Sequence, residues 1–162
     1  MSDGMTGNVV TYSRVKRRHM MGLFNMFKKK PAPDPVPTNP VSFEIAGLFA
    51  HETEAKAIMG ENPKLKKARK IEGSSIFVLS PFDGPCNIVP EPDNPHDKNA
   101  LKVVVNGQHL GYIPQYMQGQ TVKRLNAGQF AVVKLLGGNY RMYEGGEWVT
   151  YKNSIKGTIT IS

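Results

Sequence analysis

The sequence contains very little cysteine. Cys86 is the only one in 162 residues, so no disulfide can form within the chain, and cysteine-rich zinc sites are excluded. The four histidines show no HxxH or HExxH spacing, and we expect neither a metal nor another cofactor. A secreted, disulfide-stapled scaffold is excluded, and we expect a cytoplasmic protein.

Long hydrophobic runs are also missing. The apolar stretch MMGLFNMF covers only residues 20–27 and is interrupted by Asn25. A membrane-spanning helix needs about 20 apolar residues, so this stretch is too short for a span or for a convincing signal sequence. No membrane partner is expected.

Acidic residues are few relative to basic ones. The chain has 21 Lys and Arg against 13 Asp and Glu, a net charge of +8, which indicates a polyanionic partner. Residues 1–40 contain seven basic and two acidic residues and the proline-rich stretch PAPDPVPTNP. We therefore predict a basic, disordered tail over 1–40 and one domain over 41–162, with a net charge of +3.

The predicted domain has the pattern of a mainly β fold. Asn106-Gly107 stands between two alternating segments, which is the strongest short signal of a type I′ hairpin. Strands are predicted at 41–48, 76–79, 87–89, 100–105, 109–113, 129–138, 139–143, 147–151 and 154–162, with a turn at 80–85. Many short strands with two helices predict a small β-barrel or a strongly curved sheet.

Two helices are predicted. One spans Lys64–Lys70, with Asn62 as the N-cap and Pro63 as its first residue. The other spans 116–128, with Met117, Val122 and Leu125 on its apolar side and a glycine stop at its end.

The loop EPDNPHDKNA at 91–100 is unusually rigid and polar. Pro92 and Pro95 fix φ, and the side chains of Asn94 and Asp97 can accept hydrogen bonds from nearby backbone N–H groups. A proline-braced turn that feeds the hairpin explains these residues. A binding surface also explains why His96 stands beside Asp97. Both interpretations remain open from the residues alone.

The segment EPDNPHDKNALKVVVNGQHLGYIP at 91–114 resembles the signature of the HIRAN domain. That family carries a Glu-Pro-x-Asn-Pro-aromatic-Asp-x-Asn-Ala segment before a hairpin that ends in Gly-Tyr and an aliphatic residue. FEIAGLF at 43–49 and GGNYRMY at 137–143 are similar to the small stand-alone bacterial and phage members. The resemblance covers about residues 41–162.

The resemblance implies an oligonucleotide-binding (OB)-like β-barrel with two short helices that captures the 3′-hydroxyl end of single-stranded DNA. Asp97 would accept the terminal hydroxyl, and His96 stands where a stacking tyrosine is usual. Asn94 and Lys98 would flank the pocket, and Tyr112 would supply a ring. The remaining nucleic-acid-binding candidates are Phe49, Gln115 and Tyr140.

Two positions depart from the family pattern. Phe49-Ala50 stands where eukaryotic members have Arg-Tyr, and Gln115 stands where a phosphate-binding lysine is expected. The missing charge would then come from the basic run Lys64–Lys70 or from Lys123-Arg124.

Three functions remain from the sequence. The first is a non-enzymatic module that binds single-stranded DNA at 3′ ends in replication or repair, with a protein partner such as a helicase or nuclease. The second is a protein-interaction adaptor on the same fold that has lost the pocket, which Phe49-Ala50 and Gln115 favour. The third is a metal-dependent nuclease that uses Asp93, His96 and Asp97; the absence of a third carboxylate cluster disfavours it.

Overall fold

The computed structural model describes residues 35–162, and residues 36–162 form one compact unit. Ten strands and two α-helices are present in this part of the chain. The predictions for residues 1–34 lie outside the described residues. The strands are β1 (Val41–Glu44), β2 (Ser75–Phe77), β3 (Phe82–Pro85), β4 (Asn87–Pro90), β5 (Leu101–Val105), β6 (Gln108–Tyr112), β7 (Ala131–Gly137), β8 (Tyr140–Glu144), β9 (Glu147–Tyr151) and β10 (Ile155–Ile161).

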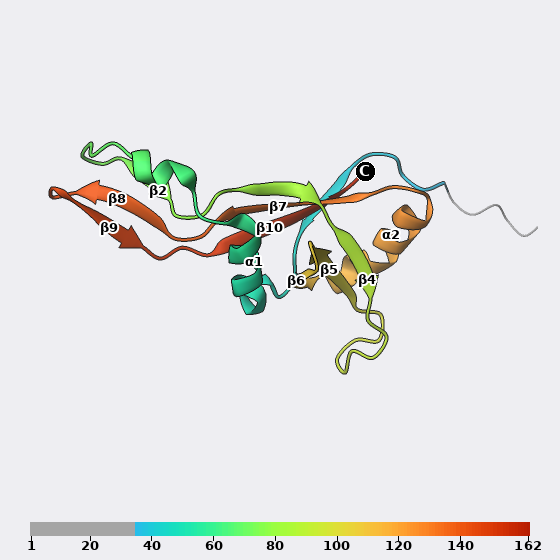
Figure 1. Ribbon diagram of the computed structural model, residues 1–162. Helices are drawn as coiled ribbons and strands as arrows, with labels where there is room; N and C mark the ends of the chain where they lie inside the picture. The colour runs from blue at the N-terminus through green and yellow to red at the C-terminus, as the bar shows by residue number, and fades with distance from the viewer. Residues whose placement is uncertain (1–34) are drawn as a thin grey trace, which may run out of the picture. The chain divides into compact units, whose positions relative to one another are not determined.

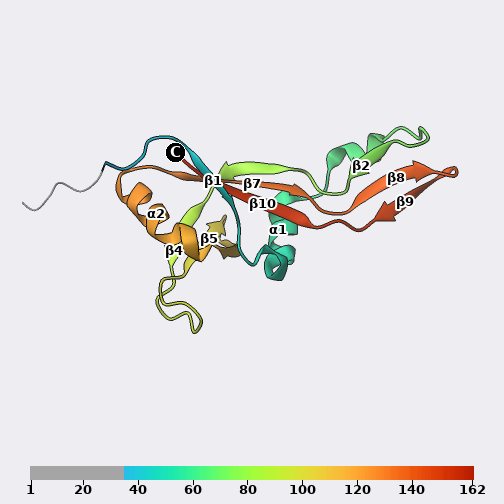
Figure 2. The same ribbon diagram turned by 180° about the vertical axis from the view of Figure 1, so that it is seen from behind.

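The strands form three antiparallel sheets, with the orders β1-β10-β7-β3, β2-β8-β9 and β4-β5-β6 (Figures 1 and 2). The prediction of a mainly β fold with two helices is confirmed. The ladders of the described residues do not close into a barrel. Two links connect the first sheet with the third. Only Cys86 separates β3 from β4, and Ala46 forms an isolated antiparallel bridge with Tyr112 of β6.

The hydrophobic core lies between the first and third sheets. Alternate residues are buried along β5, β7 and β10, including Val103, Leu135 and Ile159. This alternation places one apolar face of each strand inward. Each fully buried Val, Leu or Ile side chain contributes about 1.5–3 kcal/mol, so these three strands hold most of the unit together.

The hairpin β5–β6 has the predicted type I′ turn. Asn106 has φ 49° and Gly107 has φ 80°, which are the positive values that this turn requires at both central residues. A register shift between Val103 and Val104 leaves Leu110 of β6 as a bulge next to Gly111, which has φ 131°. A Cβ atom at Gly111 would lie 2.4 Å from the backbone oxygen of Ala46. The bridge that joins the sheets therefore requires glycine here.

The region between β1 and β4 differs most from the prediction. A 3₁₀ turn, η1 (Leu48–His51), leads into helix α1 (Glu52–Met59), which the sequence reading did not predict. The predicted helix Lys64–Lys70 is only the 3₁₀ turn η2 (Pro63–Lys67), although Asn62 caps it as expected by accepting from the Lys64 N–H at 3.0 Å. None of the η2 residues is buried. Because helices in proteins are stabilised mainly by packing, nothing here stabilises a longer helix.

The predicted turn at 80–85 was wrong. Residues Phe82–Pro85 form strand β3, which pairs with β7 at the edge of the first sheet. Pro85 favours a turn in a sequence-based prediction, because proline usually ends strands. It is tolerated here because an edge strand does not need the backbone N–H group that proline lacks.

Helix α2 (Gln115–Asn126) agrees with the prediction in position, and of the three residues predicted for its apolar side Met117 is buried and Leu125 packs against the core. Its buried residues are Met117, Thr121 and Arg124, whereas Val122 is exposed. The Arg124 guanidinium is only 3% exposed, and its Nη1 donates to the Asn39 carbonyl and to Gln129 Oε1, each at 2.9 Å. Residues upstream of position 41 therefore contact the compact unit, which spans Val36–Ser162.

The sheet β2-β8-β9, together with residues 61–74, is called the arm here. It leaves the core where β7 continues into β8 and β9 continues into β10, and both views show the β8–β9 hairpin projecting from those strands (Figures 1 and 2). None of the residues of its three strands is buried. No helix within residues 35–162 has the length and apolar character needed to cross a membrane.

Candidate nucleic-acid interface

The loop between β4 and β5 (91–100) is held by its own side chains. Asn94 Oδ1 accepts from the backbone N–H groups of His96 and Asp97, at 2.9 and 3.2 Å. Asp97 Oδ1 accepts from the Asn99 N–H at 2.9 Å, and the Ala100 N–H donates to the Asp97 carbonyl at 3.0 Å. These are the Asx-type turns that the residue pattern predicts.

Glu91 ties this loop to the hairpin. Its Oε2 accepts from Asn94 Nδ2 at 2.8 Å and from the Tyr112 hydroxyl at 2.9 Å, while its Oε1 forms an ion pair with Lys102 at 3.1 Å. The hydrogen bonds from Asn94, Lys102 and Tyr112 lower the pKa of Glu91 to about 2. Sequence reading missed Glu91 as a site residue; its spacing of three from Asn94 was the available signal.

Asp97 is fixed from two sides. Beyond its bond with the Asn99 N–H, its Oδ2 accepts from Gln118 Nε2 of α2 at 2.7 Å. The bonds from Gln118 and then Asn99 lower the pKa of Asp97, so the side chain is a carboxylate at neutral pH. A carboxylate has about four lone-pair positions, and these two bonds leave capacity for another donor. Gln118 was also missed, since nothing local in the sequence links it to the loop.

A cavity of about 260 Å³ opens where the loop, the end of the hairpin and the start of α2 meet. Five of the eight predicted binding residues contribute to its wall, and Gln118 and Pro114 complete the polar and helical sides. The lining residues are Ala46, Asn94, His96, Asp97, Ala100, Tyr112, Ile113, Pro114, Gln115 and Gln118.

A second cavity, of about 600 Å³, adjoins the first and shares Ala100, Gln115 and Gln118 with it. The predicted Lys98 lies here, and Lys123 of α2 lines the same cavity. The sequence predicts that both Lys123 and Arg124 supply positive charge, and only one of them is placed to do so. Lys123 lines the cavity, but Arg124 is buried and its guanidinium is bonded inside the unit, so it cannot contact a ligand.

Two predicted residues do not line either cavity. Phe49 lies in η1 and is 87% exposed. Tyr140 belongs to the arm, where its ring stacks on Tyr151 with the centroids 5.3 Å apart. An aromatic residue that the prediction did not include is Tyr116, which is 77% exposed and follows Gln115 at the start of α2.

The Tyr112 ring is braced from behind. It meets the His109 ring edge-on, with the ring centroids 4.8 Å apart. The His109 ring in turn packs against the His51 ring, with the ring centroids 4.1 Å apart. Burial is the main cause that lowers the pKa of His109, so this ring is neutral at physiological pH. A packed ring and a bonded hydroxyl hold Tyr112 in place at the cavity wall.

Within the described residues no group of three or more His, Cys, Asp or Glu side chains is arranged to hold a metal ion. Asp93, His96 and Asp97, which a metal-dependent nuclease would use, form no such group. The loop offers hydrogen-bond acceptors and flat rings instead.

Comparison with known protein families gives one match: residues 79–152 match the family model described as the HIRAN domain. Searches of curated proteins and of solved structures returned no match. The matched segment contains the whole 91–100 loop, the β5–β6 hairpin and α2. HIRAN domains are generally nucleic-acid-binding domains. Residues 79–152 of this chain are therefore a HIRAN domain.

Proposed function

We propose that this chain is a non-enzymatic module that binds single-stranded DNA by its 3′-hydroxyl end, in the 260 Å³ cavity beside the 91–100 loop. It would act in replication or repair, beside a protein partner such as a helicase or nuclease. The observation that carries the proposal is the fixed Asp97 carboxylate at the wall of a cavity that also includes His96 and Tyr112.

The chemistry of the carboxylate determines which part of a strand fits. An ionised carboxylate repels phosphate and can only accept hydrogen bonds. It contributes to DNA binding where the strand presents a donor without a phosphate, and a 3′-hydroxyl is such a group. Because Gln118 and Asn99 already hold Asp97, little side-chain entropy would be lost on binding.

The neighbouring groups suit the rest of the terminal nucleotides. His96 and Tyr112 would wall the last base, since flat rings stack on any base. Phosphates upstream would meet Lys98 and Lys123 in the adjoining cavity. The first turn of α2, which begins at Gln115 in the cavity wall, offers the positive end of a helix dipole where the family pattern has a lysine.

We also infer an OB-like barrel that is partly open. Ladders run from β1 through β10 and β7 to β3, and from β4 through β5 to β6. The chain passes from β3 to β4 across Cys86 alone, and the Ala46–Tyr112 bridge returns from β6 to the residues after β1, with N–H to O distances of 2.9 and 2.8 Å. This ring of contacts supports the barrel that the resemblance implies.

The test is a competition between oligonucleotides that are identical except for a 3′-hydroxyl or a 3′-phosphate. Wild-type protein should prefer the hydroxyl, because a phosphate would be forced against the Asp97 carboxylate. Asp97→Asn should narrow this preference and weaken hydroxyl binding by about 1.5–3 kcal/mol, the range for hydrogen bonds to charged groups. Asp93→Asn is the matched control, since it removes a charge from the same loop outside the cavity wall.

Equal affinity of the wild type for both ends would contradict the 3′-end proposal. Failure to bind any oligonucleotide would instead favour the protein-interaction adaptor. The observation on the adaptor's side is that both Asp97 oxygens already accept hydrogen bonds within the chain, as a purely structural turn requires.

A further inference from the structure

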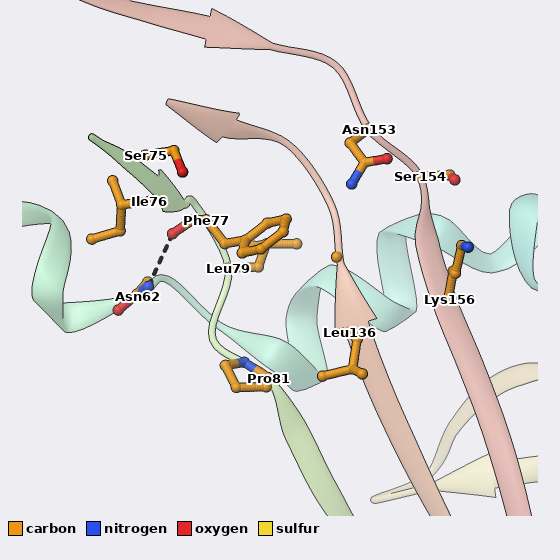
Figure 3. A pocket seen from close by; sticks show the side chains of 11 residues that line it. Asn62, Ser75, Ile76, Phe77, Leu79, Pro81, Leu136, Asn153, Ser154 and Lys156 are labelled. Atoms are coloured by element: carbon orange, nitrogen blue, oxygen red, sulfur yellow. Dashed lines mark hydrogen bonds between the residues drawn. The ribbon is translucent and has the colours of Figure 1, made fainter. Parts of the chain in front are cut away.

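A third cavity, of about 540 Å³, lies at the base of the arm and is separate from the loop (Figure 3). Its floor is apolar, with Phe77, Leu79 and Leu136 among its residues, and its rim carries the amides of Asn62 and Asn153 and the ammonium group of Lys156. Ligand sites of this size are commonly apolar with a few polar groups at the edge. None of these residues lines the cavities beside the loop.

Phe77 is the exposed aromatic residue of this cavity. Its side chain is 46% exposed although it belongs to a strand, β2. The rings of Phe77 and Tyr140 form a T-shaped pair with the centroids 6.1 Å apart, and Tyr140 is itself stacked on Tyr151. The ring is therefore supported from one side and open on the other, which is the arrangement of a platform for stacking a base.

A basic segment begins at the cavity rim. Asn62 is bonded to β2 and its continuation, through Nδ2 to the Phe77 carbonyl at 3.0 Å and through its N–H to the Val78 carbonyl at 2.9 Å. The chain then exposes five cationic side chains, Lys64, Lys66, Lys67, Arg69 and Lys70. The Gly73 N–H donates to the Tyr143 carbonyl of β8, and the Tyr143 N–H donates to the Ser74 carbonyl, each at 2.9 Å, so the end of this segment is held against the sheet of the arm.

Charge distinguishes this surface from the loop. Residues 61–78 and 139–156 together carry eight basic and four acidic residues, a net charge of +4, whereas residues 86–118 carry two basic and three acidic residues, a net charge of −1. A polyanion is thus attracted to the arm more than to the loop. The same cations disfavour a second copy of this chain as the occupant, because like charges would face each other.

We propose that the arm is a second nucleic-acid site, which binds the interior of a single strand. A base stacks on Phe77 in the 540 Å³ cavity, and the backbone phosphates on either side contact Lys64, Lys66 and Lys67. The proposal rests on the proposed function in that the ligand is single-stranded DNA, but it does not require a 3′ end. Arm and loop would hold two parts of one strand.

The test uses the full chain and a circular oligothymidine of about 30 nucleotides, which exceeds the roughly 4–16 nucleotides that one OB fold contacts. A circle has no 3′ end, so the loop cavity cannot contribute through a terminal hydroxyl. We expect fluorescence anisotropy to show binding, and Phe77→Ala to lower the affinity at least fivefold. Phe130→Ala is the matched control: this phenylalanine is also exposed but lies just before β7 and does not line the arm cavity.

Salt dependence tests the phosphate contacts. The triple variant Lys64→Gln, Lys66→Gln, Lys67→Gln should reduce the slope of log K against log salt by about 2, since each phosphate contact on a single strand contributes about 0.7. The basic residues 1–40 are present in every variant and cancel from the comparison. Thermal unfolding of each variant checks that the fold is kept, as expected for exposed side chains.

The outcomes separate the two proposals. If linear DNA binds but the circle does not, or if Phe77→Ala and the triple variant leave circle binding unchanged, the arm site is overturned and the 3′-end proposal stands. If circle and linear DNA bind equally, with a loss in the arm variants and none in Asp97→Asn, the arm site stands and the 3′-end proposal fails. If an apolar peptide occupies the cavity and DNA does not compete with it, the arm site is overturned.

Discussion

The loop region (86–118) and the arm differ in the way their residues are held. In the loop region, a connected group of polar side chains is bonded: Glu91 has three partners, Asn94 bonds in three directions and Asp97 is fixed by Asn99 and Gln118. In the arm, no strand residue is buried, and five cations extend from one exposed segment. Figures 1 and 2 show the two regions well apart within the unit.

The two regions are therefore suited to recognising different features of a ligand. A preorganised cavity with one fixed acceptor distinguishes among chemical groups, because a wrong group meets an unpaired or repelled partner. An open aromatic face with mobile lysine side chains contacts any strand, because every base has a π-face and every phosphate carries a charge. The loop region is suited to specificity and the arm to affinity.

The largest expected effect is on the scaffold of the loop region. Gly111→Ala should destabilise the unit by about 3 kcal/mol or more, because it combines a strained positive φ with a Cβ that collides with the Ala46 carbonyl. Urea unfolding measures the change. Gly119→Ala in α2, where a Cβ meets no atom within 4 Å, is the control and should be stabilising by about 0.5–1 kcal/mol. Similar values for both would show that the bridge beside the cavity is not rigid.

The next effect concerns the core that both regions share. A chain beginning at residue 41 should be less stable than one beginning at residue 36 by about 1.5–3 kcal/mol, since the buried Arg124 guanidinium loses the Asn39 carbonyl. Chemical denaturation of the two truncated chains gives the difference. Both should still bind DNA, because neither surface contains residues 36–40. Equal stabilities would place the start of the unit at residue 41.

A smaller effect is a difference in amide hydrogen exchange between the arm and the β5–β6 hairpin of the same molecule. Amide protons in the β8–β9 ladder should exchange with solvent at least tenfold faster than those in β5, a difference of about 1.4 kcal/mol in opening free energy. The reason is that β5 buries Leu101, Val103 and Val105, while β8 and β9 bury nothing. Native-state hydrogen exchange followed by NMR provides the measurement. Equal protection would mean that the arm opens only with the core.

The smallest effect is a pH dependence confined to the loop region. The Glu91 pKa is lowered to about 2 in the folded chain from an unfolded value near 4.5, so its contribution to stability is complete above about pH 4.5 and is lost as the pH falls toward 2. In Glu91→Gln, the drop in urea midpoint over this window should be shallower than in the wild type. Asp93→Asn serves as the control. An identical drop in all three proteins would contradict the role of Glu91.

Local signals in the sequence were enough for the hairpin, the Asx turns and the family. Asn106-Gly107 needs no tertiary help to favour its turn, and Pro92, Asn94 and Pro95 restrict the loop by their own covalent and hydrogen-bonding properties. The same local rigidity explains why five predicted residues do line one cavity. Elements whose signals were weak, such as α1 and β3, were missed because packing against β6 and β7 stabilises them.

The residues of the loop, its conformation and its resemblance to the HIRAN domain could be predicted, because they depend on contacts between neighbours along the chain. Only the tertiary structure decided that Gln118 reaches Asp97, that Arg124 is buried and that Tyr140 belongs to the arm. Each of these depends on which face of a helix or strand meets a distant segment. A shift of one residue in register reverses that choice, and no pattern within α2 or β8 alone specifies it.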